Sequence, residues 1–102
     1  MSLISDIKDL SYQYIKQHYD KYRLKKEKKK LSKEEINKFS NKFYDKKKYN
    51  LINFIRTNIS KEYNESEVNS LIDEYVDDKE IVICRINSEI EIYQNISKKK
   101  SQ

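Results

Sequence analysis

Apolar and aromatic residues in the first part of the chain recur at steps of three and four, which is the spacing of one face of an α-helix. At the N-terminus these residues are Leu3, Ile7, Leu10, Tyr14, His18 and Tyr22. The pattern predicts an amphipathic helix from about Ser2 to the mid-twenties. Beyond Leu24 the next apolar residue is Leu31, so a helix crossing 25–30 would have no apolar face to bury and would end there or project into water.

A second helix is predicted by the sequence SKEE at 32–35, which has the Ser-x-x-Glu spacing of a capping box. In that motif the Ser hydroxyl and the Glu carboxylate accept hydrogen bonds from backbone amides that the first turn leaves unpaired. The inner face of this helix would comprise Ile36, Phe39 and Phe43. The helical spacing resumes at Leu51, Ile52, Ile55 and Ile59, either in a third helix or in a continuation of the second.

A further helix is predicted by NESE at 64–67, where a polar N-cap residue is again followed three residues later by Glu. The apolar stripe behind it comprises Val68, Leu71, Ile72, Tyr75 and Val76. The pattern then changes in EIVICRINSEIEIYQ, where β-branched residues alternate with polar ones. This alternation favours a β-hairpin at 81–93, with Ile86 paired with Ile90 across a loop at 87–89. The alternative is a last helix capped by Ser88.

Together these elements predict a mainly α fold, a small bundle of three to four helices closed by a C-terminal β-hairpin (α+β). A chain of 102 residues suits one domain with a modest core. We place this α-rich domain at 1–97 and expect 98–102 to form a basic mobile tail.

The composition is strongly biased, because the chain has no Gly or Pro and its 22 basic residues are 19 Lys and 3 Arg. Ile, Asn and Tyr are also abundant, and all of these residues have A/T-rich codons. The bias predicts an A+T-rich genome, such as that of a large DNA virus. Part of the lysine content therefore reflects codon usage rather than selected chemistry.

Catalytic motifs are missing from the sequence. Without Gly there is neither a phosphate-cradling loop nor a dinucleotide fingerprint, since both need backbone conformations that Gly allows. One His and one Cys cannot form a zinc cluster or an internal disulfide. Cys84 alternates with Val82 and Ile86, so we expect a buried and unreactive thiol, while His18 would pack at the edge of the first helix. We expect a protein that is not an enzyme and binds no cofactor or metal.

Charge is divided unevenly along the chain. Residues 1–60 contain 16 basic and 7 acidic residues, a net charge of +9, whereas residues 61–97 contain 3 basic and 10 acidic residues, a net charge of −7. Codon bias does not explain why lysine becomes so rare after residue 61. The acidic surface we expect to face a protein partner comprises Asp73, Glu74, Asp77 and Asp78.

A basic face at 23–33 and 46–48 is the main candidate site, because lysines neutralise phosphates and release counterions without selecting a sequence. The candidate residues are Arg23, Lys25, Lys26, Lys28, Lys29, Lys30, Lys33, Lys46, Lys47 and Lys48. Tyr12 and Tyr19 lie nearby in sequence and are candidates for stacking on unpaired bases. Base-specific recognition is not expected, because Arg23 is the only arginine in this face.

These features predict a small non-enzymatic interaction or structural accessory protein that docks on a protein partner or assembly. Self-association is one form of this hypothesis, because the apolar residues between 3 and 14 suit two heptads of a coiled coil. The alternative is a non-specific nucleic-acid-binding protein that uses the basic face. Acidic residues interrupt the N-terminal apolar stretch, and IVIC is far shorter than a membrane span. An intracellular protein without membrane contact, in the cytoplasm, nucleus or a virion, is therefore expected.

Overall fold

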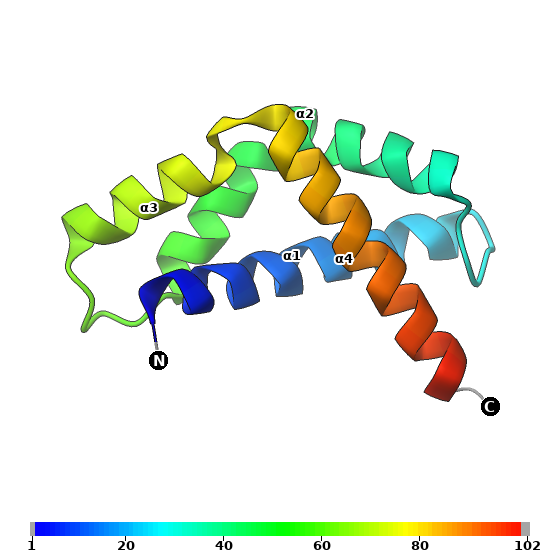
Figure 1. Cartoon of the computed structure of the whole chain (residues 1–102), viewed down its shortest axis with the longest axis horizontal. Coiled ribbons are helices and arrows are strands. Elements are labelled where there is room, and N and C mark those ends of the chain that lie inside the picture. Colours follow the sequence, from blue (N-terminus) through cyan, green and yellow to red (C-terminus); the bar gives the residue numbers. More distant parts are fainter. Residues whose placement is uncertain (1, 101–102) are drawn as a thin grey trace.

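Four α-helices pack together, namely α1 (Leu3–Lys25), α2 (Lys33–Asn58), α3 (Glu65–Asp77) and α4 (Lys79–Lys100). The computed structural model describes the backbone of residues 2–100 and the side chains of residues 2–96. In Figure 1, α1 runs along the lower side, α3 lies above it, and α4 crosses in front of α1. Each helix contacts the other three, and α2 packs most extensively against α4 and α1.

The predicted helix starts are confirmed by their caps. Ser2 accepts a hydrogen bond from the Ser5 amide, and Asn64 caps α3 in the same way. At α2, Ser32 and Glu35 form the reciprocal capping box that the sequence predicts. The Glu35 carboxylate also accepts a hydrogen bond from Lys28 Nζ, and this bond together with the capping bonds lowers the pKa of Glu35 to about 2.

The core lies where the four helices meet, and it contains most of the apolar residues that the helical spacing selected. Its fully buried members include Ile7, Tyr19, Leu31, Ile36, Ile55, Ile72, Val76 and Ile86. The region between Ser32 and Ile59, which the sequence left as one or two helices, is the single helix α2. Burial of this apolar surface provides the main driving force for packing the helices.

The predicted β-hairpin at 81–93 is wrong, because this whole segment lies within α4 and no strand occurs within residues 2–100. Val82, Ile86 and Ile90 are four residues apart and share one buried helix face. Asp78 begins the helix, because its side chain accepts hydrogen bonds from the amides of Glu80 and Ile81.

The α1–α2 loop begins with a Schellman turn. In this motif the residue that follows the C-cap of the helix usually has a left-handed backbone and is usually Gly. Here that residue is Glu27, with φ of 55°. Its amide donates to the Leu24 carbonyl, and the Lys28 amide donates to the Arg23 carbonyl. This turn explains why the basic segment after Leu24 leaves the helix instead of extending it.

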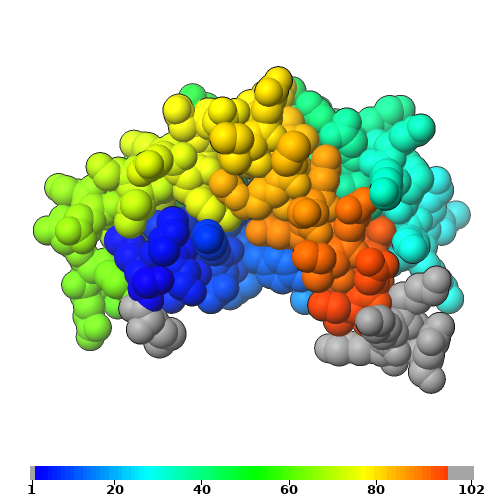
Figure 2. Space-filling view, in the orientation of Figure 1, coloured from blue at the N-terminus to red at the C-terminus, as the bar shows by residue number. Residues whose placement is uncertain are grey.

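Figure 2 shows that the side chains of α3 and α4 cover much of one face, with α1 visible between them. The predicted basic tail at 98–102 lies outside the residues whose side chains are described. No helix within residues 2–100 combines the length and apolar character that crossing a membrane requires.

Candidate anion-binding groove between α1 and α2

The ten predicted basic residues do not all line the same hollow. Lys25, Lys46 and Lys47 line a groove between α1 and α2. Lys30 and Lys33 line a different hollow, between the α1–α2 loop and α4. The structure therefore separates residues that the sequence places in one face.

The groove has a volume of about 310 Å³ and combines an aromatic floor with lysine rims. Its floor is formed by His18 and Tyr22 of α1 and by Phe39 and Phe43 of α2. The rims carry Lys21 and Lys25 from α1 and Lys42, Lys46 and Lys47 from α2. Five positive charges thus surround an apolar surface, and no carboxylate is among the residues that line it.

Helical spacing explains how the rims form. Lys21 and Lys25 are four residues apart on α1, as are Lys42 and Lys46 on α2, so each pair shares one side of its helix. Tyr49, three residues beyond Lys46, continues the same row of α2 and is 75% exposed. Sequence analysis missed Lys21, Lys42 and Tyr49 as site residues. The available clue for Lys42 was its spacing from Phe39 on α2, and for Lys21 its spacing from His18 on α1.

His18 contributes an imidazole to the floor. Its ring packs against Tyr14 and Phe43, with centroids 4.5 and 5.7 Å away. Burial lowers the pKa of His18 below its ordinary value, and the positive charges of Lys47 and Lys21 lower it further. The imidazole is therefore neutral at pH 7 and becomes a sixth positive charge only in more acidic solution.

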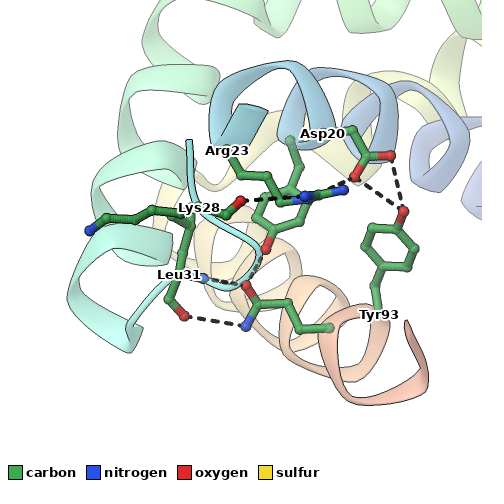
Figure 3. Close-up of polar contacts among 7 residues, drawn as sticks. Asp20, Arg23, Lys28, Leu31 and Tyr93 are labelled. Carbon is green, nitrogen blue, oxygen red and sulfur yellow. Dashed lines mark hydrogen bonds and ion pairs between the residues drawn. The ribbon is translucent and has the colours of Figure 1, made fainter. Parts of the chain in front are cut away.

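The α1–α2 loop is held in place by internal contacts, many of them visible in Figure 3. Arg23 pairs with Asp20 at 3.4 Å and donates to the Lys28 carbonyl at 3.3 Å. Lys28 forms an ion pair with Glu35 at 2.7 Å. Two of the predicted site residues, Arg23 and Lys28, are therefore already committed to structural contacts.

A buried glutamine on α4 completes this anchorage. Gln94 Oε1 accepts a hydrogen bond from the Leu31 amide at 2.8 Å, and Gln94 Nε2 donates to the Leu31 carbonyl at 3.3 Å. The same Oε1 accepts a hydrogen bond from the Tyr19 hydroxyl. One side chain thus satisfies both backbone groups of a buried loop residue, which would otherwise be costly to bury.

Neither predicted stacking tyrosine lies in the groove. The prediction for Tyr19 is wrong, because this residue is 1% exposed and bonded to Gln94, and burial raises the pKa of its hydroxyl to about 12. Tyr12 is partly buried, and burial raises the pKa of its hydroxyl, to which the charge of Glu89 on α4 adds. Among the tyrosines, Tyr22 lines the groove, whereas Tyr49 is outside the lining and has its ring centroid 5.9 Å from the ammonium group of Lys48.

The remaining predicted basic residues lie outside the groove lining. The ammonium group of Lys48 lies 5.2 Å from the ring centroid of Tyr44, whose hydroxyl bonds to the end of α3. Lys26 lies 5.0 Å from the ring centroid of Tyr22, and Lys29 is exposed in the loop.

The acidic surface and the cysteine also differ in part from the predictions. Asp73, Glu74 and Asp77 are exposed on α3, but Asp78 caps α4 instead of only facing solvent. The prediction that Cys84 is buried is wrong, because its thiol is exposed. Within the described residues, no group of three or more His, Cys, Asp or Glu side chains is placed to hold a metal ion.

The groove can attract an anionic chain through its lysines and contact planar or apolar groups through its floor. The sequence matches no family model, and comparisons with curated proteins and with solved structures gave no match.

Proposed function

We propose that this protein is a non-enzymatic binding protein whose α1–α2 groove holds a segment of single-stranded nucleic acid. The observation that supports this most is the set of five lysines around an aromatic floor. Proteins that bind single strands without sequence preference combine a positively charged groove with aromatic side chains on which bases stack.

The lysine rims provide the electrostatic part of binding. Side chains four residues apart on a helix lie roughly 6 Å apart, so both rims present regularly spaced ammonium groups. Each lysine that neutralises a phosphate releases counterions, which makes the affinity depend on salt. Arg, Asn and Gln, which recognise base edges, do not line the groove, so binding should have little sequence preference.

The aromatic groups favour a single strand over a duplex. Tyr22 lines the groove, so its ring can contact an unpaired base there, and Tyr49 is exposed further along α2. In a duplex the faces of the bases are already stacked on one another. The exposed carboxylates of α3 repel phosphates, which favours binding at the groove.

Fluorescence anisotropy with labelled single-stranded and duplex oligonucleotides tests this function. We expect tighter binding to the single strand, with log affinity falling linearly with log salt between about 50 and 200 mM. Combining Lys21→Gln, Lys42→Gln and Lys46→Gln should reduce the salt slope by about 2, since each single-strand contact contributes roughly 0.7. Tyr22→Leu should remove the single-strand preference while leaving most of the duplex affinity. Equal binding of this triple variant and the native chain would refute the proposal.

Docking on a protein partner is the second candidate, and the exposed carboxylates of Asp73, Glu74 and Asp77 on α3 favour it. A row of like charges on one helix suits a basic partner. Calorimetry with a lysine-rich peptide measures this directly. Binding that is lost in Asp73→Asn with Asp77→Asn, but kept in the groove variant, would assign the partner to α3.

A further inference from the structure

The helix α4 has apolar residues on two opposite faces. Its inner face contributes Val82, Ile86 and Ile90 to the core. Its outer face carries Ile81, Ile92 and Ile96, which are 57%, 58% and 46% exposed. A surface helix normally has one apolar face, which packs on the core, and polar residues on the opposite face. The four helices therefore leave one apolar face of α4 uncovered.

The outer residues form one continuous stripe. Ile81, Cys84, Ser88, Ile92 and Ile96 follow one another at steps of three and four, and all five are exposed. Figure 2 shows α4 at the surface on the face turned to the viewer, with no other helix in front of its coloured part. Scattered single apolar residues are normal on a surface, but a stripe along one helix indicates an interaction site.

We propose that this stripe is the interface of a symmetric dimer, in which α4 of a second copy packs antiparallel against it. The stripe is self-complementary about Ser88, because Cys84 and Ile92 lie four residues to either side of it. Ile81 and Ile96 lie seven and eight residues away. A two-fold axis needs the same patch on both subunits, and an antiparallel pair centred on residue 88 meets this condition. The small Ser88 side chain allows close approach where the helices cross.

The charges at the two ends of α4 favour a second copy of this chain as the partner that covers the stripe. They also favour an antiparallel arrangement of the two helices. Asp77, Asp78 and Glu80 surround the N-terminal end of α4. The sequence at its other end, 98–100, is three lysines. Antiparallel pairing brings the acidic end of each helix to the basic end of the other, whereas parallel pairing brings like charges together. Antiparallel helix dipoles contribute in the same direction.

The dimer leaves the candidate groove open. The side of α1 that meets α4 includes Tyr19 and Asp20, which bond to Gln94 and Tyr93 of α4. The groove is lined instead by His18, Lys21 and Tyr22, on another side of α1. Pairing through the outer face of α4 therefore does not require the groove residues, and the two surfaces can be tested separately.

Sedimentation velocity of the native chain at about 100 µM should show a dimer. Ile92→Lys should convert it to a monomer with an unchanged helical circular-dichroism spectrum, because Ile92 is exposed and contributes little to the core. Gln17→Lys, at an exposed position of α1, is the matched control and should remain dimeric. A native chain that stays monomeric at this concentration would overturn the proposal.

Cysteine crosslinking tests the antiparallel register. In a Cys84→Ser background, Ser88→Cys should form a disulfide-linked dimer on mild oxidation, whereas Ser70→Cys, exposed on α3, should not. The native Cys84 pair should not crosslink, because eight helical residues separate the two thiols by about 12 Å along the axis. Efficient linkage through native Cys84, or through Ser70→Cys as readily as through Ser88→Cys, would contradict this register.

Discussion

The α1–α2 groove and the α1–α2 loop are both rich in lysine, but their lysines have different surroundings. In the groove, Lys21, Lys42 and Lys46 surround aromatic side chains and have no ion pair among the described residues. In the loop, Lys28 pairs with Glu35, and next to the loop, at the end of α1, Arg23 pairs with Asp20. The groove therefore presents its charges outward, whereas part of the loop's charge stabilises the loop itself.

The difference shows that neighbouring groups, rather than the density of lysine, decide what a basic segment can bind. A biased composition places lysine in both regions. The groove combines its lysines with an aromatic floor that a ligand can contact, whereas the lining of the hollow beside the loop has no aromatic side chain and includes the carboxylate of Glu91. The loop instead depends on Gln94 and on a tight turn at Glu27. Substitutions in the loop should therefore change mainly the stability of the protein, and substitutions in the groove mainly its affinity for a ligand.

The largest expected effect comes from Gln94→Ala, which removes the anchor of the loop. Both backbone groups of the buried Leu31 and the Tyr19 hydroxyl would lose their partner. We expect a loss of roughly 2 to 4 kcal/mol in the free energy of unfolding, measured by urea denaturation. Asn95→Ala, an exposed neighbour on α4, should change it by less than about 0.5 kcal/mol. Equal stabilities of the two variants would mean that Gln94 does not anchor the loop.

Glu89 differs from the lysines of the groove and the loop, because its carboxylate is half-buried whereas most of those lysines are exposed. Its Oε2 atom is buried without a hydrogen-bond partner among the described residues. Burial raises the pKa of Glu89 above its ordinary value of 4.5, although Arg85 and Lys8 act in the opposite direction. The folded state therefore binds this proton more readily, and stability falls as pH rises through the raised pKa.

We expect Glu89→Gln to stabilise the protein by roughly 1 kcal/mol at pH 7, since it removes this charge. Below the ordinary pKa of Glu89 the gain should shrink, because the native carboxyl group is then protonated as well. Thermal unfolding of both chains at several pH values measures this. A gain that stays constant with pH would rule out ionisation of Glu89 as its cause.

A smaller gain is expected at the turn of the loop. Glu27 has the left-handed backbone conformation, which is unfavourable for residues other than Gly. Glu27→Gly should increase the free energy of unfolding by about 0.5 kcal/mol, because relief of this strain is partly offset by the greater freedom of Gly in the unfolded chain. Guanidinium denaturation can resolve the difference, and a loss of stability would argue against the turn described here.

The smallest effect on stability should come from the groove lysines. Lys42→Gln with Lys46→Gln removes no internal ion pair and relieves repulsion between like charges, so we expect a change of less than about 0.5 kcal/mol. Differential scanning calorimetry checks this. A large destabilisation would show that these lysines support the fold, as Gln94 does.

The first three helices could be predicted from the sequence because local rules and packing agree there. Ser32 with Glu35, and Asn64 with Glu67, have capping spacing, and the apolar residues behind them follow a helical period. The end of α1 could also be anticipated from the lack of apolar residues at 25–30. The turn at Glu27 could not, because Gly normally marks this position and the chain has none.

The fourth helix was predicted as a hairpin because its two apolar faces hide the helical period. Val82, Ile86 and Ile90 have helical spacing, but Cys84 lies between them and Ile92 follows them, which produces an apparent alternation. The β-branched content added to this impression. The outer apolar face that misled the prediction is the same face that we assign to the dimer.

The candidate site could be predicted only as a region. The sequence selected Lys25, Lys46 and Lys47, but their separation from Lys30 and Lys33 depends on how α4 packs against the loop. Tyr22 lines the groove and Tyr19 does not, and this depends on how α1 is oriented about its own axis when it packs against α2. Such relations arise from tertiary packing, which residue spacing does not fix.

The affinity of two variants of equal charge for a labelled single-stranded oligonucleotide tests the central claim most directly. One variant combines Lys42→Gln with Lys46→Gln in the groove, and the other combines Lys29→Gln with Lys30→Gln in the loop. We predict that the groove variant binds about tenfold more weakly than the native chain, and the loop variant less than about threefold. Equal weakening would show that net charge alone determines binding and would contradict a role for the groove.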